Sequence, residues 1–395
     1  MQRSFRHTVF VLLLSLLSST GYSQGLSRYP FDIIDHLSFS RIGAAEWASG
    51  GVRSAEAGSL SAPFNNPALL RAPSPTLYAE FGKRSEAAYI ADLTIDGQYL
   101  LPSFGQISVS TGNFHWALAY ASQYDRAYDY GEVKVTTVQQ PEGTEEVWKA
   151  MQRIRVHAAI ASASFVLDDG LSIGLSTGMN IVSSYDEIFT VSATGHGTGL
   201  FMIAGLYGKP FAAVHLGGSL RLSENVLFSP VSDNLPRSIT DTSNDGNNAV
   251  IRAFEPYDWQ YSARFPVTAQ AGCVWEVTEV MSLMAEIEME GWSELSVTYE
   301  STVDVHVGVL LKPHPLLHLR GGYFTESSPQ KSPTAMRIDQ RFMTAGFEWT
   351  ALSGVVITGS AVRSVWSGIR SYYLIPPKEG FYQHLYQLGL QYRLP

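Results

Sequence analysis

The sequence predicts an all-β fold, a transmembrane β-barrel, from three observations: an export signal, an apolar composition without helical spans, and apolar residues that alternate along many segments. Of the 395 residues, 45% are hydrophobic and only 16% are charged. Beyond residue 23, no run of about 18 apolar residues occurs, which excludes a transmembrane helix. A closed barrel is the other structure that satisfies every backbone hydrogen bond in lipid.

Residues 1–23 have the pattern of a cleavable secretory signal. Arg3 and Arg6 precede an apolar core that is too short to span a membrane as a helix. Cleavage near Gln24 removes two of the 27 Lys and Arg residues and no acid, which leaves 25 basic against 36 acidic residues. This negative balance disfavours a nucleic-acid partner.

Apolar and polar residues alternate over segments of about ten residues, as expected where one strand face meets lipid and the other faces the lumen. The alternation is clearest at 281–290, 303–312 and 343–349. All such runs together predict a barrel domain at 76–395 with fourteen antiparallel strands, an even number typical of bacterial barrels. The expected strands are 76–95, 103–111, 114–124, 152–167, 171–185, 196–208, 211–222, 264–277, 280–290, 302–311, 316–325, 341–350, 354–366 and 382–394.

The connections between these strands alternate in length. Bacterial barrels have short periplasmic turns and long external loops, so both ends of the mature chain are expected on the periplasmic side. The long connections, taken as external loops, are 125–151, 186–195, 223–263, 291–301, 326–340 and 367–381.

The last strand resembles the polar-x-Gly-x-x-apolar-x-apolar signal that the outer-membrane assembly machinery reads. This resemblance implies that machinery as a partner, although Pro395 stands where an aromatic residue is usual. The residues that carry it are Gln387, Gly389, Tyr392 and Leu394.

The segment 24–75 is rich in glycine and alanine and lacks strand alternation. We expect it to form a plug, or hatch, inside the barrel, where protein and water can satisfy irregular backbone. A periplasmic tail is the alternative.

Three features resemble the FadL-type outer-membrane transporters of long-chain fatty acids and other hydrophobic compounds. They are the Gly/Ala-rich segment that ends in Asn66-Pro67-Ala68, the stretch from Glu286 to Gly291-Trp292-Ser293, and Leu319-Arg320-Gly321-Gly322-Tyr323 leading into Ser327-Ser328-Pro329. The family implies a lumenal hatch, an apolar pocket reached from outside, and a kinked third strand that opens sideways into the bilayer.

The resemblance also places two candidate sites. The hatch gate is expected at Asn65, Asn66, Pro67 and Ala68. The kink candidates in the third strand are Ala121, Ser122, Gln123 and Tyr124, a stretch without glycine, so the sequence does not locate a bulge there.

A charged row on the predicted strand 152–167 offers candidate head-group ligands. Arg153, Arg155 and His157 share a parity, and we expect them to point into the lumen beside an external loop. There they either meet the carboxylate of a ligand or pair with lumenal acids such as Glu286 and Glu288.

The expected function is passive transport of a fatty acid or another hydrophobic small molecule across the bacterial outer membrane. Serines and histidines occur without a catalytic arrangement, and no metal-loop spacing is present, so we expect no enzymatic activity, cofactor or metal. The alternative is a non-transporting scaffold or shuttle protein of a secretion system. A monomer in contact with outer-membrane lipid is the default.

Overall fold

The computed structural model describes residues 42–71, 74–90, 93–136, 145–168, 170–189, 191–228, 231–232, 239–240, 250–251, 261–263, 265–295, 299–329, 331, 337–370 and 380–394. The predicted signal at 1–23 and the first part of the expected hatch, 24–41, lie outside these residues. Among the described residues, no helix is both long and apolar enough to cross a membrane.

Short helices precede the strands and follow β14. They are α2 (Ala44–Ala48), η1 (Ala62–Phe64), η2 (Pro67–Leu69) and η3 (Trp292–Glu294). The long strands are β1 (Thr76–Ile90), β2 (Leu93–Thr111), β3 (Phe114–Thr136), β4 (Glu145–Asp168), β5 (Leu171–Phe189), β6 (Val191–Phe211), β7 (Val214–Ser223), β13 (Thr268–Thr278), β14 (Met281–Glu290), β15 (Thr302–His314), β16 (Leu317–Glu326), β17 (Arg337–Leu352), β18 (Val355–Arg370) and β19 (Gly380–Arg393). The short strands are β8 (Val226–Phe228), β9 (Val231–Ser232), β10 (Ile239–Thr240), β11 (Val250–Ile251) and β12 (Tyr261–Ala263).

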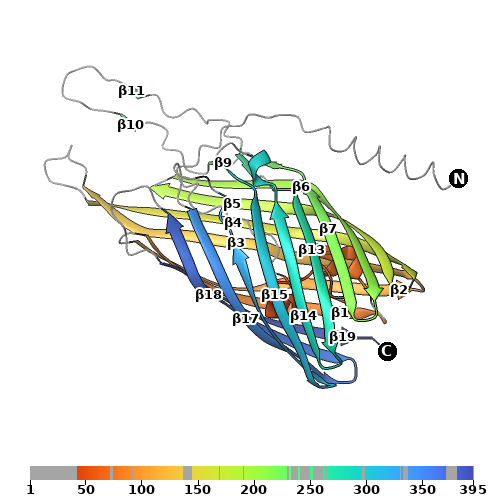
Figure 1. Cartoon of the computed structure of the whole chain (residues 1–395). Coiled ribbons are helices and arrows are strands. Elements are labelled where there is room, and N and C mark those ends of the chain that lie inside the picture. The colour runs from red at the N-terminus through yellow and green to blue at the C-terminus, as the bar shows by residue number, and fades with distance from the viewer. Residues whose placement is uncertain are drawn as a thin grey trace. The chain divides into compact units, whose positions relative to one another are not determined.

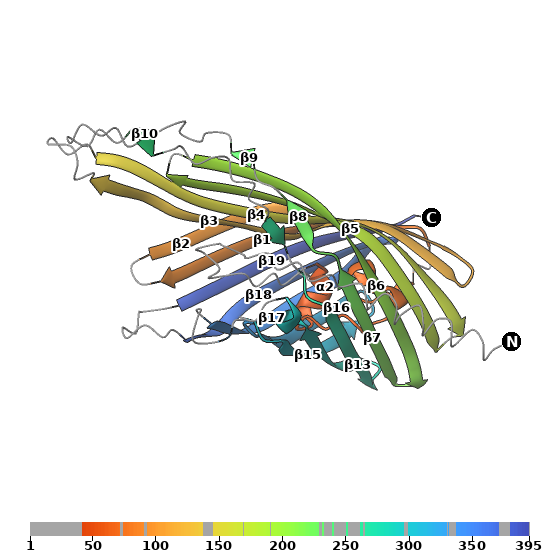
Figure 2. The same ribbon diagram turned by 90° about the horizontal axis from the view of Figure 1, so that it is seen from above.

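The fourteen long strands form one antiparallel sheet that closes on itself (Figures 1 and 2). Each strand pairs with its neighbours in chain order, β1 pairs with β19, and β7 pairs with β13 across the connection that contains β8 to β12. Closure gives the wall strands ladder partners on both sides over most of their length, as backbone groups in lipid require, and one exception lies between β2 and β3 beyond Phe104 and Ala121. The predicted number of strands is therefore confirmed.

The predicted alternation is confirmed on most strands by the exposure of their side chains. On β14, Leu283 and Ile287 are 40% and 51% exposed, whereas Glu286 between them is 2% exposed. On β19, Leu388 is exposed and the neighbouring Gln387 is buried. The outer face of the barrel is therefore an apolar band, which suits the hydrocarbon core of a membrane.

Several predicted strand ends are wrong. β1 and β2 divide the segment 76–95, which the sequence analysis treats as one strand. β3 and β4 extend through most of the predicted loop 125–151, and β5 and β6 through most of the predicted loop 186–195. These extensions contain many charged residues, and period-two apolarity marks only the part of a strand that crosses lipid.

The hatch, defined as residues 42–75, packs inside the barrel, as predicted. α2 is visible between the strands in Figure 2, and its Trp47 and Ala48 are buried. Glycines in the wall let the hatch backbone approach closely. A Cβ atom added at Gly217 would lie 1.7 Å from the carbonyl oxygen of Ser54, and one added at Gly308 would lie 2.3 Å from that of Ser49.

We expect the substitution Gly217→Ala to displace the hatch, because its methyl group would overlap the Ser54 carbonyl. Overpacking of this kind costs about 1–3 kcal/mol. Urea unfolding of the refolded barrel, followed by heat-shifted gel mobility, measures the change. Gly82→Ala is the matched control, because its added Cβ would meet its nearest atoms at 3.6 Å, an ordinary contact. Equal stability of the two variants would contradict the close seating of the hatch.

Candidate functional site

Two buried carboxylates of the wall hold the backbone of the hatch. Glu286 on β14 accepts hydrogen bonds from the backbone N–H groups of Arg53 and Ser54, at 2.9 and 2.7 Å. Glu80 on β1 accepts hydrogen bonds from the N–H groups of residues 43–44, at 3.2 and 2.8 Å. Leaving a buried N–H group unsatisfied costs about 1–3 kcal/mol. These contacts therefore fix the position of the hatch.

Ion pairs fasten the same segment to strands β14 and β16. The guanidinium of Arg320 on β16 donates to both carboxylate oxygens of Glu56, each at 2.8 Å, and to Glu348 on β17 at 3.3 Å. The guanidinium of Arg53 donates to Glu288 at 2.5 Å. A guanidinium bound through two nitrogens has a defined orientation as well as a favourable charge. The hatch is therefore fixed by charge on this side of the barrel.

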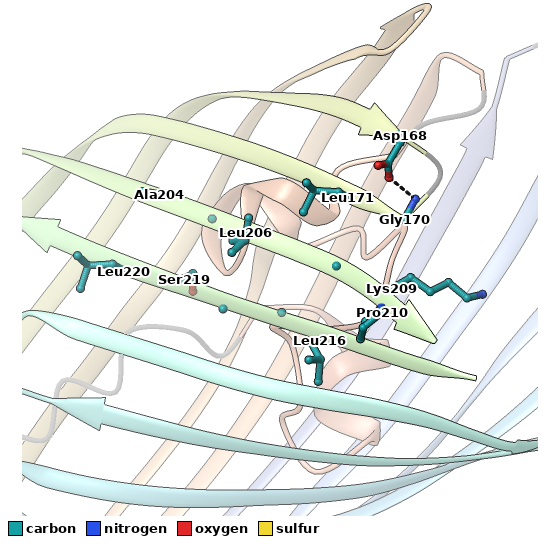
Figure 3. Close-up of a pocket in the computed structure, with 14 residues that line it drawn as sticks. Asp168, Gly170, Leu171, Ala204, Leu206, Lys209, Pro210, Leu216, Ser219 and Leu220 are labelled. Atoms are coloured by element: carbon teal, nitrogen blue, oxygen red, sulfur yellow. Dashed lines mark hydrogen bonds between the residues drawn. The ribbon is translucent and has the colours of Figure 1, made fainter. Parts of the chain in front are cut away.

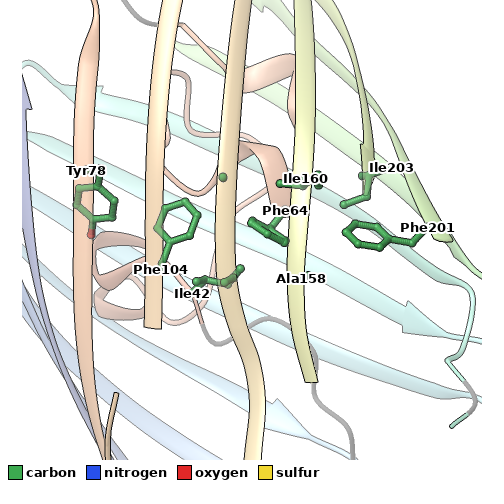
Figure 4. Packing of buried hydrophobic residues seen from close by; sticks show 10 residues of the cluster. Ile42, Phe64, Tyr78, Phe104, Ala158, Ile160, Phe201 and Ile203 are labelled. Carbon is green, nitrogen blue, oxygen red and sulfur yellow. The ribbon is translucent and has the colours of Figure 1, made fainter. Parts of the chain in front are cut away.

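Across the lumen, the hatch meets an apolar wall built by strands β1 to β6. Phe64 of η1 lies between Phe104 on β2 and Phe201 on β6 (Figure 4). The centroid of its ring is 5.8 Å from that of Phe104 and 6.4 Å from that of Phe201. Full burial of one such side chain contributes about 1.5–3 kcal/mol. We call this set the central cluster: Ile42, Phe64, Tyr78, Phe104, Ala119, Ala121, Ala158, Ile160, Phe201 and Ile203.

The wall divides beside the central cluster. The hydrogen-bonded ladder between β2 and β3 runs from Thr111 and Phe114 up to Phe104 and Ala121. Among the described residues, no pairing joins 93–103 of β2 to 122–136 of β3. Figure 2 shows β3 and β4 running away from β2 toward the connection between β3 and β4. We call this point the β2/β3 fork.

A register shift in β3 coincides with the fork. In the pairing with β4, Ser122 opposes His157 and Tyr124 opposes Val156, so Gln123 is the extra residue. Such a bulge bends a strand and increases its twist. The bend lies within the predicted kink candidates Ala121, Ser122, Gln123 and Tyr124, of which Gln123 and Tyr124 are both buried. The sequence alone does not reveal this bulge.

A second apolar cluster covers the lumen on the external side of the fork. We call it the external cluster: Tyr124, Val156, Val182, Val226, Phe265 and Trp292. A polar layer separates it from the central cluster. There, the guanidinium of Arg221 on β7 donates to Gln123 at 3.1 Å and lies 4.5 Å from the ring centroid of Phe201.

Two polar hollows lie beside the hatch among the described residues of the lumen. One, of about 30 Å³, lies among Arg53, Glu288, Asp304 and Trp292, and it is smaller than an organic ligand. The other, of about 340 Å³, opens near the periplasmic end between Glu46, Arg320 and the last residues of β19. The second hollow has the volume of a small-ligand pocket, but charged side chains line it.

A hollow of about 870 Å³ lies on the outer face of β5, β6 and β7 (Figure 3). Leu171, Leu206 and Leu216, which line it, are exposed, and Leu220 joins them. These side chains lie in the band that faces lipid, so the hollow is a surface depression of the barrel and not a lumenal ligand site.

The predicted gate residues Asn65, Asn66, Pro67 and Ala68 lie at the wall of β5 and β6. The Asn66 side chain donates to the carbonyl oxygens of Ser54 and Leu206, at 2.7 and 3.0 Å, and caps η2 by accepting from Ala68 N–H. The carbonyl oxygen of Ala68 accepts from Ser172 Oγ at 2.7 Å. These bonds attach the end of the hatch to the periplasmic half of the wall.

The predicted lumenal orientation of Arg153, Arg155 and His157 is wrong. Val156 and Ala158, which alternate with them on β4, are completely buried in the lumenal clusters. The prediction assumes that the apolar side chains of a strand face lipid. Here the apolar parity faces the lumen, because the interior is apolar on this side of the barrel.

On the outer face, these three residues pair with neighbours on β3. Arg153 donates to both carboxylate oxygens of Asp125, at 3.0 and 2.9 Å, and Arg155 lies 3.5 Å from the same carboxylate. Nδ1 of His157 shares a hydrogen bond of 2.8 Å with the hydroxyl group of Tyr120. The expected pairing with Glu286 and Glu288 is therefore wrong as well, because those acids bind the hatch.

The sequence pattern does not reveal the lumenal roles of Glu80, Phe104, Phe201 and Arg221. Phe104 and Phe201 are apolar residues that face the lumen. The assumption that apolar side chains of a strand face lipid therefore places them on the wrong side of the wall. A signal for Phe201 exists in the parity of β6, because Leu200 and Leu206 take the outer face, at 57% and 55% exposed. For Arg221 we find no such signal in the sequence.

The substitution Glu286→Ala is expected to loosen the hatch, because it leaves the N–H groups of Arg53 and Ser54 without their acceptor. The loss of about 1–3 kcal/mol for each unsatisfied group should speed amide exchange across residues 49–60. Hydrogen exchange with mass spectrometry measures this rate. Glu294→Ala, at an exposed glutamate of η3, is the control and should leave the rate unchanged. Unchanged exchange in Glu286→Ala would show that the wall carboxylate does not hold the hatch.

No model of a known protein family matches the sequence, and no curated protein matches it. Solved structures do. The match to the toluene transporter TbuX of Ralstonia pickettii has 13% identity and a TM-score of 0.65, and it covers 91% of this chain and 100% of TbuX.

Two further structures match similarly. A FadL homologue of Pseudomonas aeruginosa has 15% identity and a TM-score of 0.63, with 89% of this chain and 98% of the homologue covered. The toluene transporter TodX of Pseudomonas putida has 15% identity and a TM-score of 0.62, with the same coverage. Over most of its length, the chain therefore has the fold of the FadL-type barrels, in which a fourteen-stranded wall surrounds an N-terminal hatch.

Proposed function

We propose that the protein is a channel of the bacterial outer membrane for the passive uptake of hydrophobic small molecules. In this proposal, a ligand enters past the external cluster, is held at the central cluster, and leaves sideways into the membrane through the β2/β3 fork. The observation that carries the proposal is the position of the central cluster beside the fork, since Phe104 and Ala121 belong to both. Moving a ligand from an apolar site into lipid costs little free energy.

The arrangement of contacts around the hatch supports this route. Hydrogen bonds and ion pairs from Glu286, Glu288 and Arg320 hold the hatch on one side, whereas Phe64 meets apolar side chains on the other. Apolar contacts are non-directional and can be exchanged for contacts with a ligand. The proposed movement is therefore a displacement of the apolar side of the hatch. Its end near Asn65 to Ala68 acts as the gate, and it opens when Asn66 and Ala68 exchange their hydrogen bonds to β6 and β5.

The proposed ligand class is that of apolar organic molecules, with aromatic hydrocarbons and long-chain fatty acids as the two probes. The aromatic rings of Phe64, Phe104 and Phe201 suit a planar apolar ligand, which can pack edge-on or offset against them. Arg221, 4.5 Å from the Phe201 ring centroid, is a cation that a carboxylate head group could approach. TbuX and TodX are described as toluene transporters, which makes a monoaromatic hydrocarbon the first probe.

The binding test uses the full chain refolded in detergent, with radiolabelled toluene and a radiolabelled long-chain fatty acid in separate experiments. Saturable binding above that of an unrelated barrel is expected for at least one probe. Phe201→Asn should weaken it about tenfold or more, because it places an amide in the central cluster. Phe211→Asn, at a phenylalanine that is 71% exposed at the end of the same strand, is the matched control. Absence of saturable binding with both probes would refute the proposal.

Deleting Gln123 tests the lateral route. The deletion removes the extra residue of the β3 bulge, so β3 should straighten and continue its pairing with β2. We expect uptake of the bound probe into proteoliposomes to fall about tenfold, while Gln123→Ala retains most of it. Heat-shifted gel mobility confirms that both variants are folded. Wild-type uptake by the folded deletion variant would exclude the fork as the exit.

A non-transporting secretion scaffold is the other function class that the sequence leaves open. It requires no ligand at the central cluster and no movement of the hatch. The binding test therefore separates the two functions, because only the channel predicts a difference between Phe201→Asn and Phe211→Asn.

A further inference from the structure

Three basic residues form a patch on the outer face of the barrel. Lys83 on β1, His384 on β19 and Arg363 on β18 have lipid-facing parity, and Lys83 and Arg363 are exposed. His384 lies directly opposite Arg363 in the ladder, and Lys83 opposes Tyr386, one outward position below His384. Residues opposite each other in a ladder have Cβ atoms about 4.5–5.5 Å apart, and diagonal neighbours about 7–8 Å apart. We call these three residues the basic patch.

The depth of the basic patch places it at the external interface of the membrane. On β19, Tyr392, Leu390, Leu388 and Tyr386 follow one another on the outer face, each at least 43% exposed. From Tyr392 to His384, a tilted strand rises roughly 20 Å, which is most of the apolar band of about 25 Å. Outward tyrosines occupy both ends of this row, as in an aromatic girdle. His384 therefore lies just beyond the external girdle.

The patch has no acidic neighbour among the described side chains of β18, β19 and β1. Those side chains include one acid, Glu80, and it is buried in the lumen against the hatch. No ion pair joins Lys83, Arg363 or His384 to a described carboxylate. Arg153 and Arg155, which face outward on β4, differ from the basic patch because both contact Asp125.

We propose that the basic patch binds the phosphate group of a lipid in the outer leaflet of the membrane. At this depth the available anions are lipid head groups, and a guanidinium beside an ammonium supplies several N–H donors to one phosphate. Lys83 can extend its apolar stem along the wall and present its charge at the interface. Tyr386 and Phe81, 54% and 52% exposed, lie below it to contact the acyl chains. The inference rests on the position of the barrel in the membrane and not on the proposed ligand.

The test is native mass spectrometry of the full barrel, refolded in detergent and titrated with bisphosphorylated lipid A. Phosphatidylglycerol, phosphatidylcholine and inorganic phosphate are titrated in parallel. Each cation near an anionic membrane surface contributes about 1 kcal/mol, or about fivefold in affinity. Lys83→Gln combined with Arg363→Gln should therefore weaken binding of the phosphorylated lipid roughly 25-fold. Lys209→Gln is the control, because Lys209 lies at the opposite, periplasmic end of the wall.

The site is supported if the variant with Lys83→Gln and Arg363→Gln selectively loses binding of anionic lipid. The variant with Lys83→Arg and Arg363→Lys should retain that binding. Stronger binding of lipid A than of phosphatidylglycerol identifies a phosphorylated glycolipid as the occupant, and the reverse order identifies a glycerophospholipid. Equal binding by the wild-type and the folded double variant overturns the proposal. So does equal binding of phosphatidylcholine and lipid A, or displacement of the lipid by millimolar inorganic phosphate. If the double variant fails to fold, the single variants Lys83→Gln and Arg363→Gln replace it. Each should weaken binding of the phosphorylated lipid about fivefold.

Discussion

The hydrogen bonds from the hatch backbone to Glu80 and Glu286 are the interactions on which the interior of the barrel depends. A hatch of short helical turns exposes backbone N–H groups that a strand ladder cannot satisfy. In a lumen surrounded by lipid, those groups need partners from the wall. The two carboxylates supply them, one from β1 and one from β14. Wall glycines let the hatch backbone approach the wall backbone closely, so both carboxylates are buried between the hatch and the wall.

This constraint divides the lumen into two unlike sides. Strands β14 to β17 carry the charged groups, including Arg320 with its partners Glu56 and Glu348. Strands β1 to β4 and β6 carry the wall residues of the central cluster, with Phe104 and Phe201 on either side of Phe64. Ion pairs and hydrogen bonds hold the hatch on the first side. On the second side, apolar contacts surround the Phe64 ring, and hydrogen bonds join Asn66 to β6 and Ala68 to β5. The ladder between β2 and β3 also ends on the apolar side. In the proposed route, an apolar ligand therefore reaches the fork without crossing the charged side.

The sequence predicts the wall better than the interior, for a physical reason. Period-two apolarity identifies the part of each strand that faces lipid, so the fourteen strands and the outward rows on β14, β15 and β19 were predictable. The same rule fails on β4, where Val156 and Ala158 face an apolar lumen and Arg155 faces outward. Alternation states that two faces differ but not which face is inside. The bulge at Gln123 depends on pairing with β4, and no single residue type marks it.

The central claim is that an apolar ligand passes the central cluster and leaves through the β2/β3 fork. Photocrosslinking tests this claim most directly, with an apolar diazirine probe bound to the refolded full chain and the labelled residues located by mass spectrometry. We predict labels on Phe104, Ala121 and Phe201, and on the neighbouring residues of β2 and β3 at the fork. Labels confined to the outer hollow of β5 to β7, or to the polar hollow beside Arg320 and Glu46, would contradict it.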